Sequence, residues 1–476
     1  MLTREKLEDV FGEVCIDKTL VASAGIGKES SRSIPTFVAE WIVDRHSPSG
    51  ILDMGTKAKI HDFIRMHLPS KDQKNDIKYA LRNGKSVVIL DNYSVSVDLQ
   101  TNRLRLRIPS IDEPNACVEQ FIVEENPFLL IRGMWGAGRL SYRPPTPGTK
   151  TGQGEIWMID FKPMQIRTVD LDYYCTARSE FSLEEWLELL LTSMGYNTEV
   201  YSVPSQQLIL LGRLLPLVHG RINLVELAPK GTGKSYVYTN LTRHVWTVSG
   251  GKISAAALFY DERGKGREGL LTRYDTVVFD EVQTLSFDNP GLVVGTLKVY
   301  MESGEFTKGK IPAAADCSIV MLGNIPIDSS GLPRSQLLLA TLPQFLQETA
   351  LLDRIHGILP GWELPRISRK ALTRGIGFKA DFFGEVLHNL RNRTDDAEFV
   401  KSHARISGTD DLRDTRAIER LAAAYLKLLF PNLAPREDEF YEYCLRPAVD
   451  LRQRVRDQLS QMDAEYKQFK ITAEVV

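Results

Sequence analysis

The sequence has little cysteine, almost no net charge and no long apolar run, and each absence narrows the range of functions. Five cysteines stand far apart among 476 residues, and no two of them form a CxxC pair. We therefore expect reduced thiols rather than a disulfide framework or a zinc site. Lysine plus arginine total 59 against 61 acidic residues. This balance excludes a protein that coats nucleic acid through its overall charge, but it does not exclude a local basic surface.

Neither the N-terminus nor the most apolar segment suits export or a membrane. The opening residues, MLTREKLEDVFGEV, are acidic and amphipathic, which is not typical of a signal peptide. The most apolar run, Leu208 to Val218, contains Arg213 and Pro216 and has about half of the ~20 residues that a membrane span requires. We expect a soluble, cytoplasmic protein without a membrane partner.

The chain falls into three zones without internal repeats, and the predicted fold is multidomain, α/β and α+β. Residues 1–200 predict an N-terminal module that is helical over 1–80 and β-rich over 86–176. Alternating strand and helix patterns over 201–366 predict a parallel α/β core, and residues 367–476 predict a helical lid. The clearest helical patterns are Ser182–Met194, Ser205–Val218, Asp411–Phe430 and Glu437–Lys470.

The β-rich zone consists of short segments rich in β-branched and aromatic residues, separated by Asn, Asp, Gly and Pro. The predicted strands are SVVIL, YSVSVDL, RLRLRI, QFIVEE, FLLIRG and EIWMIDF. So many short strands predict a small barrel or a sandwich, and an OB-like barrel is one candidate. The Pro- and Gly-rich residues 143–154 are expected to form an exposed loop, and Ser47–Gly50 (SPSG) a turn between helices.

The strongest signal for chemistry is INLVELAPKGTGKS, residues 222–235. An apolar strand leads into a glycine-rich turn and a helix, which is the P-loop pattern except that Ala228 replaces its first glycine. Backbone N–H groups of such a loop face phosphate oxygens, Lys234 reaches the β and γ phosphates, and Ser235 holds Mg²⁺. We predict binding of ATP and Mg²⁺ by Pro229, Lys230, Gly231, Thr232, Gly233, Lys234 and Ser235.

Polar residues at the ends of two later apolar strands suit the remaining roles of an ATPase. In YDTVVFDE, Asp280 is expected to bind the metal through water and Glu281 to polarise the attacking water. In CSIVMLGN, Asn324 either orients the same water or is an ordinary turn asparagine. In LLDRIHG, Arg354 either pairs with Asp353 on the surface or acts as an arginine finger on a neighbouring subunit's γ phosphate.

The order of APKGTGKS, VVFDE, MLGN, LLDRIHG and a helical C-terminal zone resembles an AAA+ ATPase. Longer stretches resemble the BrxL family, the Lon-like AAA+ component of BREX phage-defence systems. These stretches are ELAPKGTGKSYVY, VSGGKISAAALFYDERGKGREGLL, VVFDEVQ and MESGEFTKGKIPAAADCSIVMLGNIP. The resemblance covers roughly residues 1–460 and is most specific over 205–365, where the chain more distantly resembles the MCM helicases.

The resemblance implies a role for each matching residue. Lys234 with Ser235 match the Walker A pair, Asp280 with Glu281 match Walker B, and Asn324 matches sensor 1. Arg354 matches the arginine finger, which acts on the next subunit. Arg413 stands seven residues before Arg420 and matches the sensor 2 helix, acting from either side of the interface.

Two groups of basic residues are candidates for DNA contact. GEFTKGKI resembles a hairpin whose lysine contacts DNA in the central channel, which implies Lys308, with Lys310 as its nearest substitute; the alternative is a solvated hairpin tip. Arg103, Arg105 and Arg107 alternate with leucine, so a strand would present them on one face.

The surroundings of that arginine strand leave two interpretations open. Nearby arginines, interleaved with Trp135 and Tyr142, suit a surface that tracks a nucleic-acid backbone; they are Arg132, Arg139 and Arg143. However, residues 85–150 hold eight basic and seven acidic residues, which equally fits an ordinary solvated β face. The family resemblance implies an N-terminal DNA-binding module and favours DNA.

The resulting prediction is a ring-forming ATPase, a hexamer or stacked hexamers, that binds and translocates on double-stranded DNA in phage defence with other BREX proteins. One alternative is a protein remodeller, for which Phe306 offers an aromatic beside the hairpin lysines. Another is an ATP-dependent DNA clamp, which has no need of Glu281 as a base. The longer Lon-like members carry a protease-like domain with a Ser-Lys dyad, and this sequence ends at Val476, so we expect no peptidase activity.

Overall fold

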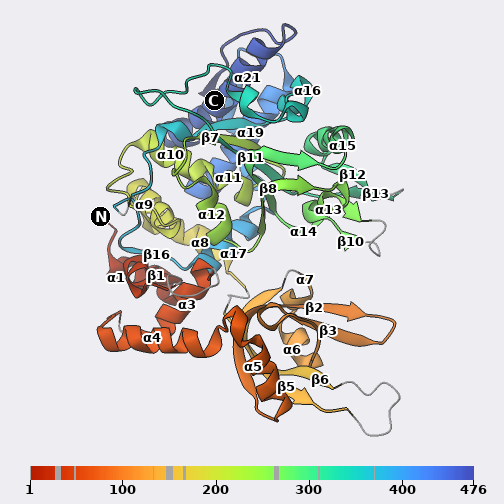
Figure 1. The fold of residues 1–476 in the computed structure, drawn as a ribbon. Helices are drawn as coiled ribbons and strands as arrows, with labels where there is room; N and C mark the ends of the chain where they lie inside the picture. Colours follow the sequence, from red (N-terminus) through yellow and green to blue (C-terminus); the bar gives the residue numbers. More distant parts are fainter. Residues whose placement is uncertain are drawn as a thin grey trace. The chain divides into compact units, whose positions relative to one another are not determined.

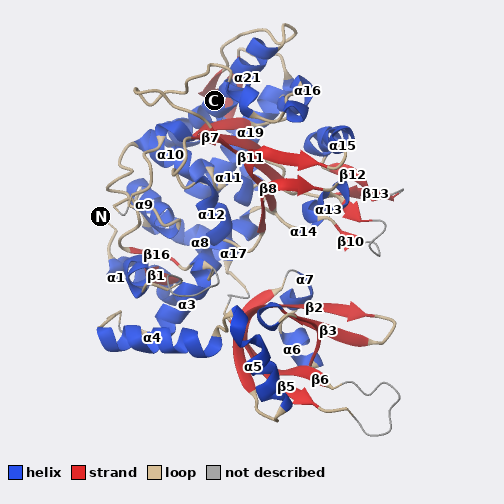
Figure 2. Cartoon of the chain, viewed as in Figure 1, coloured by secondary structure: helices blue, strands red, loops and turns tan. Residues whose placement is uncertain are grey.

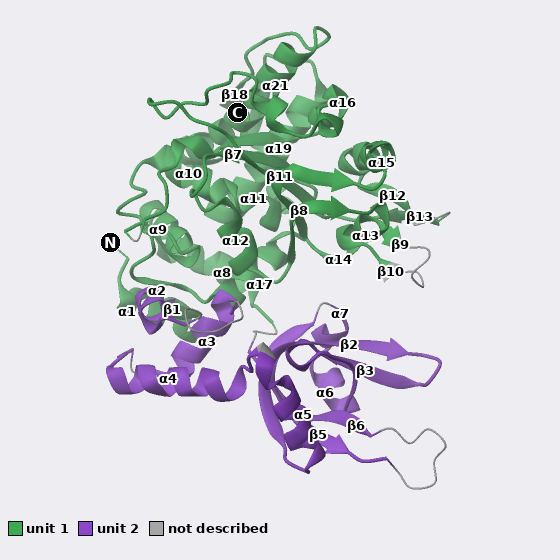
Figure 3. Ribbon diagram, viewed as in Figure 1, with its two compact units in different colours: residues 1–15, 168–476 green, residues 16–167 purple. Residues whose placement is uncertain are grey.

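The chain forms two compact units in the computed structural model, residues 16–167 and residues 1–15 with 168–476 (Figure 3). The described residues are 2–26, 34–47, 50–131, 133–145, 154–164, 168–261, 267–308, 311–368 and 370–476. All five cysteines are free thiols, as their spacing predicts. No helix among the described residues combines the length and the apolar character that crossing a bilayer requires.

The smaller unit begins with helices, as the sequence predicts. They are α2 (Lys18–Ala24), α3 (Thr36–His46), α4 (Met54–His67) and α5 (Lys74–Arg82). Asp53 caps α4, because its carboxylate accepts a hydrogen bond from the backbone N–H of Thr56. The break after α3 is a turn in which the Gly50 N–H donates to the Ser47 carbonyl at 3.0 Å, although residues 48–49 lie outside the described residues.

The β-rich zone closes into a five-stranded barrel, so the prediction of a small barrel is confirmed (Figures 1 and 2). Its strands are β2 (Val87–Asp98), β3 (Arg103–Ile108), β4 (Glu113–Val118), β5 (Met134–Arg143) and β6 (Glu155–Pro163), in the order β2-β3-β4-β6-β5. The β4–β6 pair is parallel. Inside the barrel, a Cβ at Gly138 would lie 2.6 Å from the Tyr93 hydroxyl, so glycine there makes room for the buried ring.

Two of the predicted strands are helices. QFIVEE forms α6 (Gln120–Glu125) and FLLIRG contains α7 (Phe128–Ile131). Apolar runs this short fit the period of a strand or of a helix, and local hydrogen bonds decide between the two. Here the Asn126 amide donates to the Ile122 carbonyl at 2.8 Å and ends α6. The two predicted strands SVVIL and YSVSVDL belong to the single strand β2. Residues 146–153 of the predicted 143–154 loop lie outside the described residues.

A five-stranded parallel sheet forms the core of the larger unit, as predicted (Figure 1). Its order is β15 (Gly357–Pro360), β7 (Asn223–Ala228), β14 (Ser318–Asn324), β11 (Thr276–Phe287) and β8 (Val245–Ile253). All four pairings are parallel. β7 is buried along its whole length, which explains why its residues other than Asn223 and Glu226 are apolar. The carboxyl ends of β7 and β14 therefore lie side by side, next to β11.

The remaining elements of the larger unit are mostly helices (Figure 2). The N-terminal and central helices are α1 (Arg4–Phe11), α8 (Leu171–Ala177), α9 (Leu183–Ser193), α10 (Pro204–Gly212), α11 (Leu215–Val218), α12 (Lys234–Asn240), α13 (Ala255–Leu258), α14 (Leu270–Arg273) and α15 (Pro290–Ser303). The later helices are α16 (Thr349–Leu352), α17 (Ala380–Leu390), α18 (Asp395–His403), α19 (Leu412–Leu429), α20 (Glu437–Phe440) and α21 (Arg446–Met462). Two separate two-stranded sheets are β12 (Glu305–Lys308) with β13 (Ile311–Ala314), and β17 (Ala404–Ser407) with β18 (Thr472–Val475).

Two helical predictions are confirmed to the capping residue, and two need correction. Ser182 caps α9 and Asp411 caps α19, each through a side chain that accepts from a backbone N–H. The pattern over 205–218 is two helices, since Pro216 lacks the N–H that a continuous helix needs. The pattern over 437–470 stops being helical at Met462, and residues 472–475 pair with 404–407 as strands, so the C-terminal zone is not wholly helical.

Candidate functional site

The glycine-rich loop between β7 and α12 is held in a defined shape. Gly231 and Gly233 have φ angles of 85° and 72°, in the left-handed region that favours glycine. The Gly231 carbonyl accepts from the Ile367 N–H at 2.8 Å, and the Thr232 hydroxyl donates to the Pro229 carbonyl at 3.2 Å. Space is open where a Cβ of Gly231 would lie. This open, preformed loop fits the phosphate cradle that the sequence predicts.

Lys234 and Asn324 meet at the carboxyl edge of the sheet. The Lys234 amine donates to Asn324 Oδ1 at 2.9 Å, and Asn324 is the last residue of β14. Burial lowers the pKa of the Lys234 amine. The Gln283 amide donates to the Asn324 backbone carbonyl at 2.7 Å and fixes this end of β14. Asn324 is therefore part of the cluster around the P-loop lysine and not an isolated turn asparagine.

Ser235 and Asp280 form the second contact at this edge. The Ser235 hydroxyl donates to Asp280 Oδ2 at 2.7 Å, which joins the start of α12 to β11. A hydroxyl beside a carboxylate supplies the oxygen ligands that Mg²⁺ prefers. The residues present therefore fit a magnesium ion in the position that the sequence predicts.

Glu281 lies at an irregularity in β11 and not at its end. The sequence predicts a strand that stops at Glu281, but β11 continues to Phe287 and shifts its register against β8 between Asp280 and Leu285. A bulge of this kind re-aims side chains, which is why bulges occur beside active sites. Glu281 is exposed and has a φ of 49°, rare for a residue with a side chain. The Thr284 hydroxyl holds this backbone by donating to the Glu281 carbonyl at 2.9 Å.

A buried ion pair between Arg213 and Glu226 supports the P-loop through a contact with its backbone. Arg213 and Glu226 have fully buried side chains, and Arg213 Nη2 donates to Glu226 Oε1 at 2.6 Å. The same guanidinium donates to the Thr232 carbonyl at 3.3 Å and to the Tyr196 hydroxyl at 2.6 Å. Burial lowers the pKa of Arg213, but the charge of Glu226 outweighs it and raises that pKa overall. This pair is not among the residues that the sequence predicts. Its signal in the sequence is an arginine and a glutamate within two otherwise apolar segments.

Arg354 and Arg413 meet at the opposite edge of the sheet. Both Nε atoms contact Glu302 Oε2, Arg354 at 3.1 Å and Arg413 at 3.2 Å. Asp353 is buried and accepts from Arg413 Nη1 at 2.8 Å and from Arg452 at 2.8 Å. Burial lowers the pKa of Arg413, but its contacts with Asp353 and Glu302 raise that pKa overall. The ion pair that Arg354 makes is therefore with Glu302, and not with Asp353 as the surface alternative predicts.

The length of β7 separates these arginines from the P-loop. The Arg354 carbonyl accepts from the side chain of Asn223, the first residue of β7, at 3.3 Å. The P-loop follows Ala228, the last residue of that strand. A six-residue strand spans roughly 17 Å. Neither arginine therefore lies beside Lys234 of its own chain.

The three candidate arginines on β3 are only partly available. Arg103 pairs with Glu155, and Arg105 Nε lies 3.7 Å from Asp98 Oδ2. Arg107 is exposed and makes no ion pair with a described residue.

The neighbouring arginines on β5 are also paired with acids. Arg139 lies 3.7 Å from Asp160, and Arg143 lies 2.5 Å from Glu119. The Arg143 guanidinium also lies over the Trp157 ring, 3.9 Å from its centre. Arg132 lies outside the described residues. The described part of the barrel thus presents mixed charge, and Arg107 is the one of its three β3 arginines for which no ion pair with a described residue is found.

The hairpin that the sequence resemblance implies for GEFTKGKI corresponds to the antiparallel strands β12 and β13. Lys308 ends β12 and pairs through its backbone with Ile311, while Lys310 lies outside the described residues. Phe306 is 4% exposed, with ring centres 5.7 Å from Phe259 and 6.0 Å from Tyr300. The aromatic residue of this hairpin therefore packs in the core and does not form an exposed aromatic loop.

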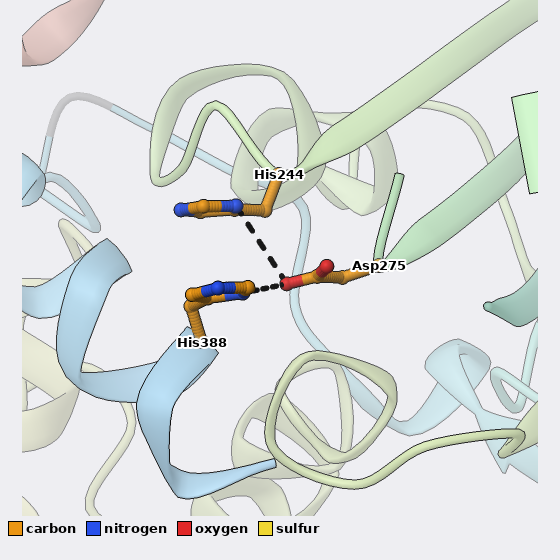
Figure 4. Close-up of side chains that lie close together, drawn as sticks. All are labelled: His244, Asp275 and His388. Carbon is orange, nitrogen blue, oxygen red and sulfur yellow. Dashed lines mark hydrogen bonds and ion pairs between the residues drawn. The ribbon is translucent and has the colours of Figure 1, made fainter. Parts of the chain in front are cut away.

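A second polar cluster joins α17 to the starts of β8 and β11 (Figure 4). His388 Nδ1 and His244 Nδ1 lie 2.5 and 3.7 Å from Asp275 Oδ2. These atoms are close enough to suggest a metal ion, but the imidazole planes are 5° apart and stacked at 4.0 Å. Because a metal bonds in the plane of each ring, parallel stacked rings do not converge on one ion. His244 Nε2 also lies 2.7 Å from Glu385, so this is a hydrogen-bonded structural cluster.

Two family models match most of the chain. The model described as "Lon-like protease BrxL-like, ATPase domain" matches residues 156–472. The model described as "BREX system Lon protease-like protein BrxL N-terminal" matches residues 9–142. The first range contains the P-loop, Asp280, Glu281, Asn324 and both arginines of the opposite edge.

Two curated proteins named "Lon-like protease BrxL" are similar to the chain. The protein from Escherichia coli O9:H4 (strain HS) is 28% identical over 434 residues, which cover 90% of this chain and 61% of that protein. The protein from Bacillus cereus (strain H3081.97) is 29% identical over 440 residues, which cover 90% of this chain and 63% of that protein. The chain thus spans less than two thirds of the length of these relatives.

Proposed function

The chain belongs to the BrxL family and carries its ATPase domain, and we propose that it is a ring-forming AAA+ ATPase that translocates on double-stranded DNA in BREX phage defence. One observation carries the proposal: the residues expected to form the two halves of an ATP site lie in two clusters at opposite edges of one sheet. Lys234, Ser235, Asp280, Glu281 and Asn324 gather at the carboxyl edge. Arg354 and Arg413 gather at the other.

Each residue of the carboxyl edge has a defined task in ATP hydrolysis. Lys234 would exchange its contact with Asn324 for the β and γ phosphates. Ser235 and Asp280 would hold Mg²⁺, which neutralises charge on the phosphates. Glu281 would orient the attacking water and take its proton on the exposed carboxylate, and Asn324 would align the same water from the end of β14.

The arginines of the opposite edge would serve the nucleotide of a neighbouring subunit. Their separation from Lys234 by the length of β7 supports this role for both, and for Arg413 it favours the trans position over the cis position. A site completed in trans requires an oligomer, and head-to-tail contacts that close on themselves form a ring. A hexamer, or two stacked hexamers, is the assembly that we propose.

DNA would contact the β12–β13 hairpin in the centre of the ring, through Lys308 and Lys310. Arg107 on the barrel would add a second phosphate contact, while Arg103 and Arg105 are held by acids. Such contacts grip the backbone and do not read the sequence. Other BREX proteins would bring the ring to its target DNA.

The alternatives have less support. A remodeller that pulls polypeptides needs an exposed aromatic loop, and Phe306 is buried. A clamp that never hydrolyses ATP has no use for a glutamate held in a left-handed backbone beside the metal-binding carboxylate. Peptide hydrolysis is not part of the proposal. Ser47, at the start of the turn predicted for SPSG, is buried and donates to the Ile51 carbonyl at 2.7 Å, so it is not presented as a nucleophile.

Steady-state ATP hydrolysis with and without plasmid DNA tests the proposal, with Glu281→Gln as the blank. We expect stimulation by DNA that falls steeply with salt, because the contacts are to phosphates. Hydrolysis that ignores DNA but rises with an unfolded protein would favour the remodeller. Binding of ATP without any hydrolysis would favour the clamp.

A further inference from the structure

Glu302 lies between the two arginines of the opposite edge. Its Oε2 atom is 3.1 Å from Arg354 Nε and 3.2 Å from Arg413 Nε. The Glu302 side chain is 38% exposed, that of Arg413 is 40% exposed and that of Arg354 is 17% exposed. One carboxylate thus holds both guanidiniums at a surface that solvent reaches.

Glu302 and the two arginines line one cavity, and Glu302 is the accessible acid in its lining. The other acid in its lining, Asp353, is buried and bound by Arg452 and Arg413. The remaining charged residues of the lining are basic: Arg354, Arg413, Arg416, Arg420 and Arg452. A phosphate group that entered would find an excess of guanidiniums and would compete with the Glu302 carboxylate, since guanidinium binds both anions by charge-assisted hydrogen bonds.

The position of Glu302 in the chain links this cavity to the hairpin. Glu302 lies in the last turn of α15, and β12 begins at Glu305 (Figure 1). Between them Gly304 turns the chain with a φ of 81°, and its N–H donates to the Tyr300 carbonyl at 2.7 Å. Arg221 Nη1 donates to the Ser303 carbonyl at 2.7 Å and supports the same junction. A change in the contacts of Glu302 therefore acts directly on the base of the hairpin.

We propose that Glu302 is a positioning residue that occupies Arg354 and Arg413 until the triphosphate of the neighbouring subunit replaces its carboxylate. The released Glu302 then frees the end of α15, and the hairpin moves with it. By the same linkage, DNA on the hairpin draws Glu302 from the arginines and favours their contact with the triphosphate. This inference rests on the proposed function, in which both arginines act on the neighbour's nucleotide.

Glu302→Gln tests the inference, and Glu348→Gln is its matched control. Glu348 pairs with Lys298 at 2.6 Å, and Lys298 lies in α15, the helix that also holds Glu302. Among the ion pairs of the described residues, Glu348 has none with Arg354 or Arg413. Glu302→Gln should raise kcat/KM for ATP without DNA by about two- to fivefold, the effect of one partly exposed ion pair. The value of kcat/KM at saturating DNA should stay the same, so the stimulation of kcat/KM by DNA falls by that factor. Glu348→Gln should leave both rates at the wild-type values.

The outcomes separate this inference from the proposed function. If DNA stimulates the wild type and Arg354→Ala abolishes hydrolysis, but Glu302→Gln behaves as Glu348→Gln, the inference is wrong and the proposed function stands. If Arg354→Ala keeps full activity or the wild type ignores DNA, the proposed function fails and takes the inference with it. Glu302→Asp, which is too short to hold both arginines, should show a smaller rise than Glu302→Gln; an unchanged rate would count against the inference.

Discussion

The Lys234 amine donates a hydrogen bond to the Asn324 side chain across 2.9 Å, joining the P-loop lysine to the end of the neighbouring strand. The contact places a neutral amide next to the group expected to hold the γ phosphate. We predict that Asn324→Ala lowers kcat by on the order of 100-fold, the effect of losing one preorganised donor. Affinity for a fluorescent ATP analogue should change little. A loss of affinity with unchanged kcat would show that Asn324 supports binding and not the chemical step.

Glu281 should be needed for hydrolysis but not for nucleotide binding. Glu281→Gln removes the carboxylate that takes the proton of water, so we expect kcat to fall by at least about 100-fold. Lys234→Ala should instead abolish binding of the analogue. Measuring analogue binding and hydrolysis for both variants separates the role of Lys234 in binding from the role of Glu281 in hydrolysis. Hydrolysis by Glu281→Gln at the wild-type rate would show that this glutamate does not act in the mechanism.

Removing only one partner of the ion pair between Arg213 and Glu226 should destabilise the fold. Arg213→Met leaves Glu226 buried without its partner, and we expect a loss of about 3–5 kcal/mol in the free energy of unfolding. The double change Arg213→Met with Glu226→Leu should be less destabilising than the single change. Urea unfolding measures both, and a double variant weaker than the single one would contradict an ion-pair origin of the effect.

Buried histidines should make the fold sensitive to acid. Burial lowers the pKa of His244 to about 4 and the pKa of His219 to about 3, from an ordinary value of 6.5. The unfolded chain binds these protons first, so stability is full above pH 6.5 and falls as the pH drops below it. Each histidine costs about 1.4 kcal/mol per pH unit in that window. Urea unfolding between pH 7 and pH 5 checks the slope, and stability that rises towards pH 5 would contradict it.

The arginines of β3 should differ in their contribution to DNA binding. Arg107→Ala should reduce the slope of log affinity against log salt by about 1, because this side chain is free to neutralise a phosphate. Arg103→Ala should have less effect, since Glu155 already neutralises that guanidinium. Fluorescence anisotropy with duplex DNA over a salt series compares both variants with the wild type, and an Arg107→Ala slope equal to the wild-type slope would exclude a phosphate contact by Arg107.

The sequence predicts those parts of the site whose residues are close in the chain. The P-loop is one contiguous segment, so its strand, glycines, lysine and helix could be located together. Asp280 and Asn324 end apolar segments, and parallel strands bring such ends to one edge. The bulge after Asp280 was not predictable, because it depends on the register of β11 against β8 and not on the sequence of β11 alone.

The contacts that escaped prediction join residues that are distant in sequence or ambiguous in pattern. In the sequence, Arg213 and Glu226 are single charged residues within apolar segments. Only the fold shows that the two side chains form an ion pair. Glu302 lies in a helix remote in sequence from Arg354 and Arg413. The segment QFIVEE forms a helix whose end is capped by the Asn126 amide, a contact that its apolar pattern does not reveal.

Mixing two inactive variants tests most directly whether the ATP site is completed by a neighbouring subunit. The Lys234→Ala subunit lacks the P-loop lysine but keeps Arg354. The Arg354→Ala subunit lacks the arginine finger but keeps Lys234. Each variant alone should be unable to hydrolyse ATP. Rings that contain both should recover hydrolysis, because an intact loop of one subunit then meets an intact Arg354 of the next. If every mixture stays inactive although mixed rings form, Arg354 acts within its own subunit and the shared site is contradicted.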